Sequence, residues 1–317
     1  MNITEIKQKI ENGAFDKDFT MLYGDVSAAR ARYSAACDSF CGIFPERDGI
    51  RLFSAPGRTE VGGNHTDHQH GCVLAGGVNL DVIAIVAPNN DGKVRIKSEG
   101  YDMDVIDIAE LEKNEAEHGR ASALIRGVLS RFKELGCTLS GFNAYTTSNV
   151  LKGSGLSSSA AFEVLVGNIV NGMFFENKAD EITIAKIGQY AEREYFGKPC
   201  GLLDQMASSL GGFTYADFFD PAEPITEKIN LDIHSFGYTL CVVDTGGNHA
   251  NLTQDYADIT IECKKISNAL GVDFLRDADS DRFYKSIPEL RRSCGDRAVL
   301  RAFHFFNEQN RVEEQKA

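Results

Sequence analysis

Hydrophobic and polar positions follow two different periods along this chain, which indicates that helices and strands are interspersed. Residues 1–50 are polar and helical in pattern, and Asp25 can cap a helix that continues to Phe40. Farther on, apolar runs bounded by turn residues predict strands, and apolar residues three or four apart predict helices. The predicted strands are 51–55, 80–87, 93–98, 102–108, 141–147, 213–217 and 238–244. The predicted helices are 121–135, 160–175, 181–196, 204–210, 252–270 and 297–314.

Turn residues predict how some of these strands end and pair. Pro56-Gly57 is expected to close the strand at 51–55. The cluster of Pro, Asn, Asp and Gly at 88–92 predicts a hairpin that joins the strands on either side of it. Because strands and helices mix without strict βαβ alternation, the pattern indicates an α+β fold.

Composition places the chain among ordinary soluble globular proteins. Its 317 residues suggest about two domains, with 43% hydrophobic and 25% charged residues. The net charge is −13 and no Lys/Arg cluster exceeds a pair, which argues against nucleic acid or an anionic membrane as a partner. The eight cysteines lack the spacing of a zinc ribbon and no signal peptide is recognisable, so we expect a cytoplasmic protein with reduced thiols.

A loop of small residues precedes the predicted helix at 160–175. Two glycines let the backbone turn tightly and approach a ligand, and three hydroxyl groups follow them. A helix that begins after such a loop presents free N–H groups and the positive end of its dipole, which suit a phosphate group. The alternative for such a loop on its own is an ordinary helix N-cap. The candidate phosphate-binding residues are Gly153, Ser154, Gly155, Leu156, Ser157, Ser158 and Ser159.

Two further segments, together with this loop, carry a family resemblance. One reads Gly57-Arg58-Thr59-Glu60-Val61-Gly62-Gly63-Asn64-His65-Thr66-Asp67 and continues to Gly71-Cys72-Val73-Leu74. The other is Ala191-Glu192 followed by Gly201-Leu202-Leu203-Asp204-Gln205. In order and spacing, the three segments resemble the GHMP small-molecule kinases and, within them, the galactokinases. The agreement extends from about Arg51 to Tyr256.

The resemblance implies a fold of two domains and an ATP-dependent sugar 1-kinase. Residues 1–215 would form a domain like the second domain of ribosomal protein S5. Residues 216–317 would begin an α+β, ferredoxin-like C-terminal domain. The implied reaction is phosphorylation of galactose at its C1 hydroxyl, with ATP and Mg²⁺, giving galactose 1-phosphate.

The family motifs also imply a role for particular residues. Asp204 would accept a hydrogen bond from the C1 hydroxyl, and Arg58 would pair with Asp204 and stabilise charge on the transferring phosphoryl group. Ser159 and Glu192 would be the Mg²⁺ ligands. The residues expected to recognise the sugar are Asn64, His65, Asp67, the Gly201 backbone and Tyr256.

Four positions depart from the galactokinase pattern. Asn64 stands where Glu is usual, His68 where Tyr is usual, Glu60 where Asn is usual and Leu151 where Pro is usual. The altered sugar loop leaves open a kinase for a related sugar, such as an N-acetylated hexosamine, or a sugar- and ATP-binding regulator without turnover. A metal site built from His65, Asp67, His68 and His70 is a further alternative.

The C-terminus lacks the last glycine-rich motif of the family. In the final helix, Leu300 and Phe303 are spaced to face a core, with Phe305 and Phe306 beside them. We therefore expect a truncated second domain, a tendency to associate through exposed apolar surface, and little kinase turnover.

Overall fold

The computed structural model describes residues 1–44, 48–150, 153–243 and 253–317. Its chain forms two compact units. The first comprises Met1–Gly57, Val78–Leu151 and Ser157–Cys200, and the second comprises Arg58–Gly77, Lys152–Leu156 and Gly201–Ala317. Both β1 and β2 contribute residues to each unit. The units therefore differ from the domains 1–215 and 216–317, which stay a prediction.

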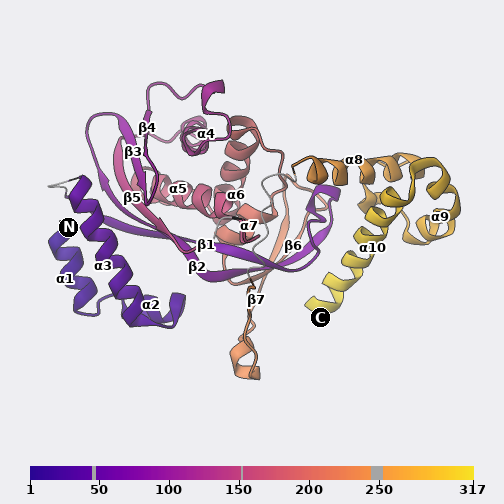
Figure 1. The fold of residues 1–317 in the computed structure, drawn as a ribbon, viewed down its shortest axis with the longest axis horizontal. Coiled ribbons are helices and arrows are strands. Elements are labelled where there is room, and N and C mark those ends of the chain that lie inside the picture. Colours follow the sequence, from indigo (N-terminus) through magenta and orange to yellow (C-terminus); the bar gives the residue numbers. More distant parts are fainter. Residues whose placement is uncertain (45–47, 151–152, 244–252) are drawn as a thin grey trace. The chain divides into compact units, whose positions relative to one another are not determined.

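The first unit contains a mixed sheet with helices on both of its faces (Figure 1). Its strand order is β4-β3-β5-β2, in which β3 and β5 are parallel and the other neighbours antiparallel. The elements are α1 (Ile3–Glu11), α2 (Asp16–Tyr23), α3 (Val26–Ile43), β1 (Arg51–Gly62), β2 (Cys72–Pro88), β3 (Lys93–Ser98), β4 (Met103–Asp107), η2 (Glu115–Glu117), α4 (Ala121–Glu134), β5 (Phe142–Ser148), α5 (Ser158–Phe174), α6 (Glu181–Tyr190) and the π-helix η3 (Ala191–Phe196).

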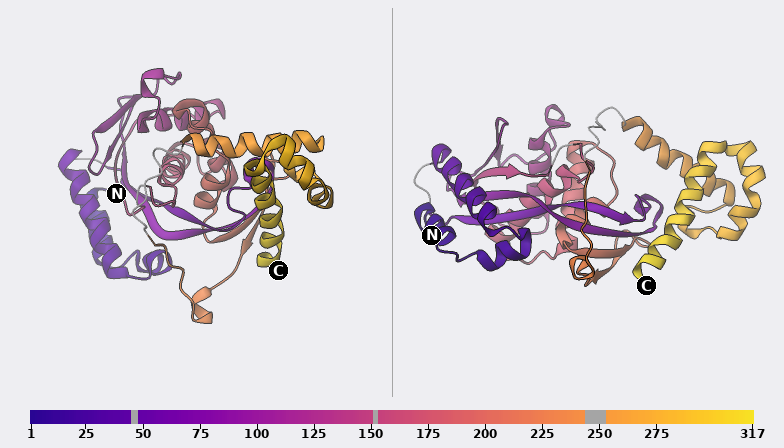
Figure 2. Two further views of the ribbon diagram at one scale, coloured as in Figure 1. Left: turned by 45° about the vertical axis from the view of Figure 1, so that its right-hand side comes forward. Right: turned by 60° about the horizontal axis from the view of Figure 1, so that its bottom comes forward.

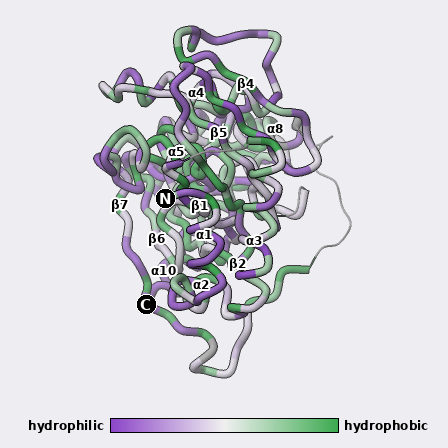
Figure 3. Tube along the Cα trace, turned by 90° about the vertical axis from the view of Figure 1, so that its left-hand side faces the viewer, coloured by the Kyte–Doolittle hydropathy of each residue, from purple (hydrophilic) through white to green (hydrophobic). Residues whose placement is uncertain are grey.

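Local signals set the limits of the N-terminal helices. Asp25 caps α3 as predicted, since its carboxylate accepts the Ala28 N–H at 3.0 Å. Apolar side chains of α1–α3 then pack on one face of the sheet, against Ile83 and Ile85 of β2. The alternation of hydrophilic and hydrophobic residues along these helices can be followed in Figure 3.

The second unit combines short strands with a group of three C-terminal helices. Its strands pair in the order β2-β6-β7, all antiparallel. Helices α8, α9 and α10, drawn from orange to yellow in Figure 2, share one apolar core. The elements not yet given are η1 (Asp67–Gln69), α7 (Leu203–Leu210), β6 (Phe213–Asp217), β7 (Ile225–Ile229), η4 (Ile233–Phe236), α8 (Thr253–Leu270), η5 (Leu275–Asp277), α9 (Ser280–Cys294) and α10 (Asp296–Lys316).

Two predictions about strands were wrong for reasons of pairing. Strand β1 continues through Pro56-Gly57 to Gly62, because it pairs with β2. A proline is tolerated in an edge strand, where its missing N–H has no neighbouring strand to bond. The predicted hairpin does not form. Strand β5 lies between β2 and β3, so β3 pairs with β4 and β5 instead.

Two further predictions were wrong. The expected strand at 238–244 is irregular over its described residues 238–243, and Asp244 lies outside the described residues. In α10, Leu300 and Phe303 are 66% and 40% exposed, whereas Phe305 and Phe306 face the shared core. Strand β7 and helix α9 were not predicted from the sequence. Within the described ranges, no helix is long and apolar enough to cross a membrane.

A buried carboxylate joins α2 and α3 to the sheet of the first unit. Asp81 of β2 accepts the Tyr23 hydroxyl at 2.6 Å and forms an ion pair with Arg32. The Ser54 hydroxyl also donates to it. Burial and the negative charge of Asp81 raise the pKa of Tyr23 to about 12, so this phenol stays protonated and remains a donor at neutral pH.

We expect Asp81→Ala to lower the free energy of unfolding by about 3–5 kcal/mol, because it leaves the Arg32 charge without its buried partner. Asp38→Ala is the matched control. Asp38 pairs with Lys7 at 2.5 Å on the surface, and its loss should cost less than about 1 kcal/mol. Urea unfolding of both variants measures the difference. Equal losses would contradict the role given to Asp81.

Candidate active site

An ion pair in the second unit joins two of the predicted catalytic residues. Arg58 of β1 donates from Nε to Asp204 Oδ1 at 2.8 Å and makes a second bond to the same oxygen from Nη2. The guanidinium also donates to the backbone oxygen of Gly155, and the Arg58 N–H donates to the Leu156 oxygen at 3.1 Å. The structure thus brings Arg58, Asp204 and the glycine loop together, and the pairing of Arg58 with Asp204 is the one that the family resemblance implies.

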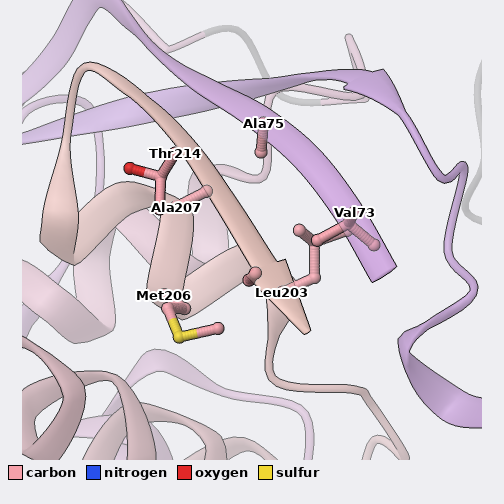
Figure 4. Close-up of a pocket in the computed structure, with 7 residues that line it drawn as sticks. Val73, Ala75, Leu203, Met206, Ala207 and Thr214 are labelled. Carbon is pink, nitrogen blue, oxygen red and sulfur yellow. The ribbon is translucent and has the colours of Figure 1, made fainter. Parts of the chain in front are cut away.

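Helix α7 carries Asp204 and is fixed by apolar packing beneath it. Asp204 lies in the first turn of this helix, one residue after Leu203. A small pocket separates α7 from β2 and β6 and has only apolar side chains and one threonine on its walls (Figure 4). Its lining consists of Val73, Ala75, Leu203, Met206, Ala207, Thr214 and Ala216. This lining suits helix-to-strand packing and not a charged substrate.

The segment between β1 and β2 carries three of the predicted sugar-binding residues, Asn64, His65 and Asp67. We call residues 63–71 the sugar loop. Its Asp67 is buried and accepts the Leu203 N–H at 3.2 Å. Gly201 lies against the same carboxylate, because a Cβ atom at this position would overlap Asp67 Oδ2. The structure therefore places Asp67 beside Gly201 and the first turn of α7.

The backbone of the sugar loop is left-handed at consecutive positions. The φ angles of Gly63, Asn64 and His65 are 99°, 29° and 60°. Asparagine tolerates this region better than glutamate does, because its short side chain can bond locally. Glu60, which the sequence reading noted only as a departure, supports the turn by accepting the His65 N–H at 2.8 Å. Burial raises the pKa of Glu60.

The alternative of a metal site in the sugar loop is not supported. No group of three or more His, Cys, Asp or Glu side chains that could hold a metal occurs among the residues the structure describes. The side chains that crowd together in the sequence have separate partners. The His70 ring stacks on Phe274 with centroids 3.6 Å apart, and the carboxylate of Asp67 accepts from the backbone of α7. Burial lowers the pKa of His68, which favours its neutral form.

The phosphate loop leads into a helix N-terminus, but that helix begins earlier than the apolar pattern at 160–175 predicts. Gly153 and Gly155 have φ angles of 73° and 78°, and the N-cap Ser157 has a φ of 55°. Helix α5 starts at Ser158, so Ser158 and Ser159 belong to its first turn, where N–H groups lack an acceptor within the helix. Ser154 and Leu156 complete the loop; Leu151 lies outside the described residues.

Two oxygen ligands expected for Mg²⁺ lie together in the first unit. The Ser159 hydroxyl donates to Glu192 Oε1 at 3.2 Å. Glu192 is 1% exposed and belongs to the π-helix that continues α6, where a regular helix was expected. Lys198 donates to the same Oε1 at 2.8 Å, a contact that the sequence reading missed. Burial, and after it the charge of Glu192, raises the pKa of the Cys200 thiol.

Tyr256, the last predicted sugar-binding residue, lies on α8. Its side chain is outside the described part of the structure. A place for it in the sugar site stays a prediction.

Comparison with known proteins gives matches to two family models and to galactokinases. The family model described as GHMP kinases N terminal domain matches residues 123–212, and the one described as galactokinase galactose-binding signature matches residues 38–88. The chain is 31% identical to a galactokinase of Streptomyces coelicolor over 83% of this chain and 67% of that protein. It is 28% identical to a galactokinase of Bacillus subtilis over 86% of this chain and 73% of that protein. The chain thus spans about two thirds to three quarters of these relatives.

Solved structures show the same fold. Galactokinase of Lactococcus lactis, complexed with galactose, superposes with a TM-score of 0.72 at 22% identity, covering 89% of this chain and 73% of that one. Mevalonate kinase of Methanococcus jannaschii gives a TM-score of 0.53 at 14% identity, covering 84% and 81%. These likenesses confirm the predicted α+β fold of the GHMP kinases.

We expect Gly201→Ala to lower the free energy of unfolding by about 1–3 kcal/mol, because the new methyl group must displace the Asp67 carboxylate from the Leu203 N–H. Gly42→Ala is the control. Gly42 lies in α3 with no atom near the position of a Cβ, so alanine should stabilise the helix by about 0.5–1 kcal/mol. Urea unfolding of both variants tests the expectation, and a stabilised Gly201→Ala would contradict it.

Proposed function

Because the chain belongs to the galactokinase family of GHMP kinases, we propose that it transfers the γ-phosphoryl group of ATP to the C1 hydroxyl of galactose. The products are galactose 1-phosphate and ADP. The observation that carries the proposal is the ion pair between Arg58 and Asp204, two motif residues far apart in the sequence. This pair offers a negative charge for the attacking hydroxyl and a positive charge for the transferring phosphoryl group.

We assign separate tasks to the two members of this pair. The Asp204 carboxylate accepts a hydrogen bond from the C1 hydroxyl and orients its oxygen for attack on the γ-phosphorus. The Arg58 guanidinium is always charged and planar, so it can hold Asp204 with one edge and stabilise charge on the transferring group. Asn64, His65, Asp67 and Gly201 are assigned to the sugar.

The phosphates of ATP are assigned to the glycine loop and the first turn of α5. Ser159 and Glu192 fit Mg²⁺, which takes oxygen ligands and usually only one or two from the protein. Bound there, Mg²⁺ would neutralise negative charge on the phosphates. The ammonium of Lys198 on Glu192 supports this assignment, since it shows that a cation fits beside this buried carboxylate.

We expect Asp204→Asn to lower kcat by about 10²–10⁴-fold, because the amide cannot orient the hydroxyl as a charged acceptor does. The affinity for ATP should change little. Asp281→Asn is the matched control, since Asp281 also lies in the first turn of a helix but is exposed on α9. Steady-state kinetics and ATP titration measure both effects. More than about a tenth of the parent kcat, a loss of only ~1.4 kcal/mol, would remove Asp204 from its role.

Asn64 gives a specific reason to test other sugars. A carboxylate only accepts hydrogen bonds, whereas an amide both donates and accepts. A substrate that presents an acceptor, such as the acetamido carbonyl of an N-acetylated hexosamine, therefore fits Asn64 as the usual glutamate would not. A panel of hexoses and N-acetylated hexosamines, scored for ADP release, distinguishes the two substrate classes.

If galactose is the substrate, Asn64→Glu should bind it several-fold more tightly, because a charge-assisted hydrogen bond replaces a neutral one. Asn64→Gln is the control, since it has the length of glutamate without the charge and meets the same left-handed backbone. Isothermal titration with galactose compares the three proteins. Binding by Asn64→Glu that is no tighter than binding by Asn64→Gln would refute the expected effect.

A further inference from the structure

Helix α10 binds both ends of the sugar loop. Glu308 Oε2 accepts the Gly63 N–H at 3.0 Å, directly after β1 ends, and Gln309 Oε1 accepts the Cys72 N–H at 2.5 Å, where β2 begins. Between these points, His304 Nε2 donates to the Asn64 carbonyl oxygen at 3.2 Å. Three side chains from one helix thus satisfy backbone groups of a loop that lies more than two hundred residues earlier.

Glu308 is the most deeply buried of these three residues. It is 5% exposed, and its other oxygen pairs with Arg311 one turn along the helix. A buried carboxylate that accepts a backbone N–H makes a charge-assisted bond, which is shorter and stronger than a neutral one. A buried charge without such partners would be costly, so the bond to Gly63 also stabilises Glu308 in its position.

The sugar loop needs support of this kind. Its left-handed residues include Asn64 and His65, and non-glycine residues in that region cost roughly 1–2 kcal/mol each. Such a conformation persists only where the surroundings determine it. The backbone at Gly63 also lies close to the start of β2, because a Cβ there would overlap the Cys72 carbonyl and Val73. The contacts from α10 fall on Gly63 and Asn64, within this strained run.

A second group of contacts holds the other side of the same loop. Gln69 Oε1 accepts the Leu275 N–H at 3.2 Å, and the stacked rings of His70 and Phe274 lie next to it. Like α10, residues 274 and 275 belong to the C-terminal helical part of the second unit. Residues 274–309 therefore support the sugar loop on both sides, in addition to the contacts from Glu60 and Leu203.

We propose that Glu308 is a positioning residue for sugar recognition, which fixes through Gly63 the backbone that presents Asn64, His65 and Asp67. The proposal rests on the proposed function, because it assumes that these loop residues bind the sugar. Glu308 itself does not touch the substrate. Its removal should weaken sugar binding and leave nucleotide binding unchanged.

The experiment compares Glu308→Ala with Glu262→Ala in the same 317-residue chain. Glu262 is a matched control, because it is a buried glutamate of the same helical group that pairs with Arg297 and has no described contact with the sugar loop. We expect Glu308→Ala to raise the Kd and KM for galactose about tenfold. Its Kd for ATP and its kcat at saturating galactose should stay within twofold. Glu262→Ala should lower Tm and leave galactose binding within twofold.

Milder variants keep the test decisive if Glu308→Ala does not fold. Glu308→Gln retains an acceptor oxygen for Gly63 and loses only the charge, so galactose binding should weaken less than in Glu308→Ala. His304→Ala removes the bond to Asn64 and should weaken galactose binding two- to threefold. Galactose binding within twofold of the parent in both variants, or equal losses in the Glu308 and Glu262 variants, would overturn the proposal.

Hydrogen exchange separates failure of this proposal from failure of the proposed function. The amides of Gly63 and Cys72 are bonded to α10, so exchange in a peptide covering 61–72 should accelerate in the Glu308 variants and not in Glu262→Ala. If the parent chain bound no galactose, the proposed function would fail, and this exchange would still report whether Glu308 holds the loop. Unchanged exchange in Glu308→Ala would overturn the positioning role.

Discussion

A buried guanidinium imposes the strongest constraint on the second unit. Arg58 is 5% exposed and cannot lose its charge, so its donors must all find acceptors inside the protein. Asp204 neutralises the charge, and the carbonyl of Gly155 accepts a further N–H. Strand β1, the glycine loop and α7 therefore converge on one side chain, although they are about a hundred and fifty residues apart at the extremes. The arrangement of these three elements follows from satisfying this one charge.

Much of the local structure was predictable because its signals are short. The glycines before α5, the acid that caps α3 and the motif around Asp204 each depend on a few neighbouring residues. The resemblance to galactokinases added what local rules cannot, namely that Arg58 and Asp204 would meet. The α+β class followed from the order of helical and strand patterns alone.

The failures share a physical cause, since each depends on contacts between distant residues. A turn at 88–92 favours a hairpin, yet β5 pairs with both neighbouring strands and separates them, which no local pattern encodes. The periodicity of α10 points Leu300 inward, whereas the core that α8 and α9 offer lies on the side of Phe305 and Phe306. Glu308 was missed for the same reason, because its partner Gly63 lies 245 residues earlier in the sequence.

The two cations that pair with candidate-site carboxylates, Arg58 and Lys198, differ in how freely they can move. Arg58 is buried and bonds Asp204 through two of its nitrogens, so it acts as a fixed part of the site. The Lys198 side chain is 50% exposed while its partner Glu192 is almost fully buried. If Mg²⁺ took the place of the ammonium at Glu192, as proposed above, Lys198 could therefore return to water on its flexible stem, whereas the carboxylate could not. Without such a ligand, Lys198 neutralises a buried acid that would otherwise be costly.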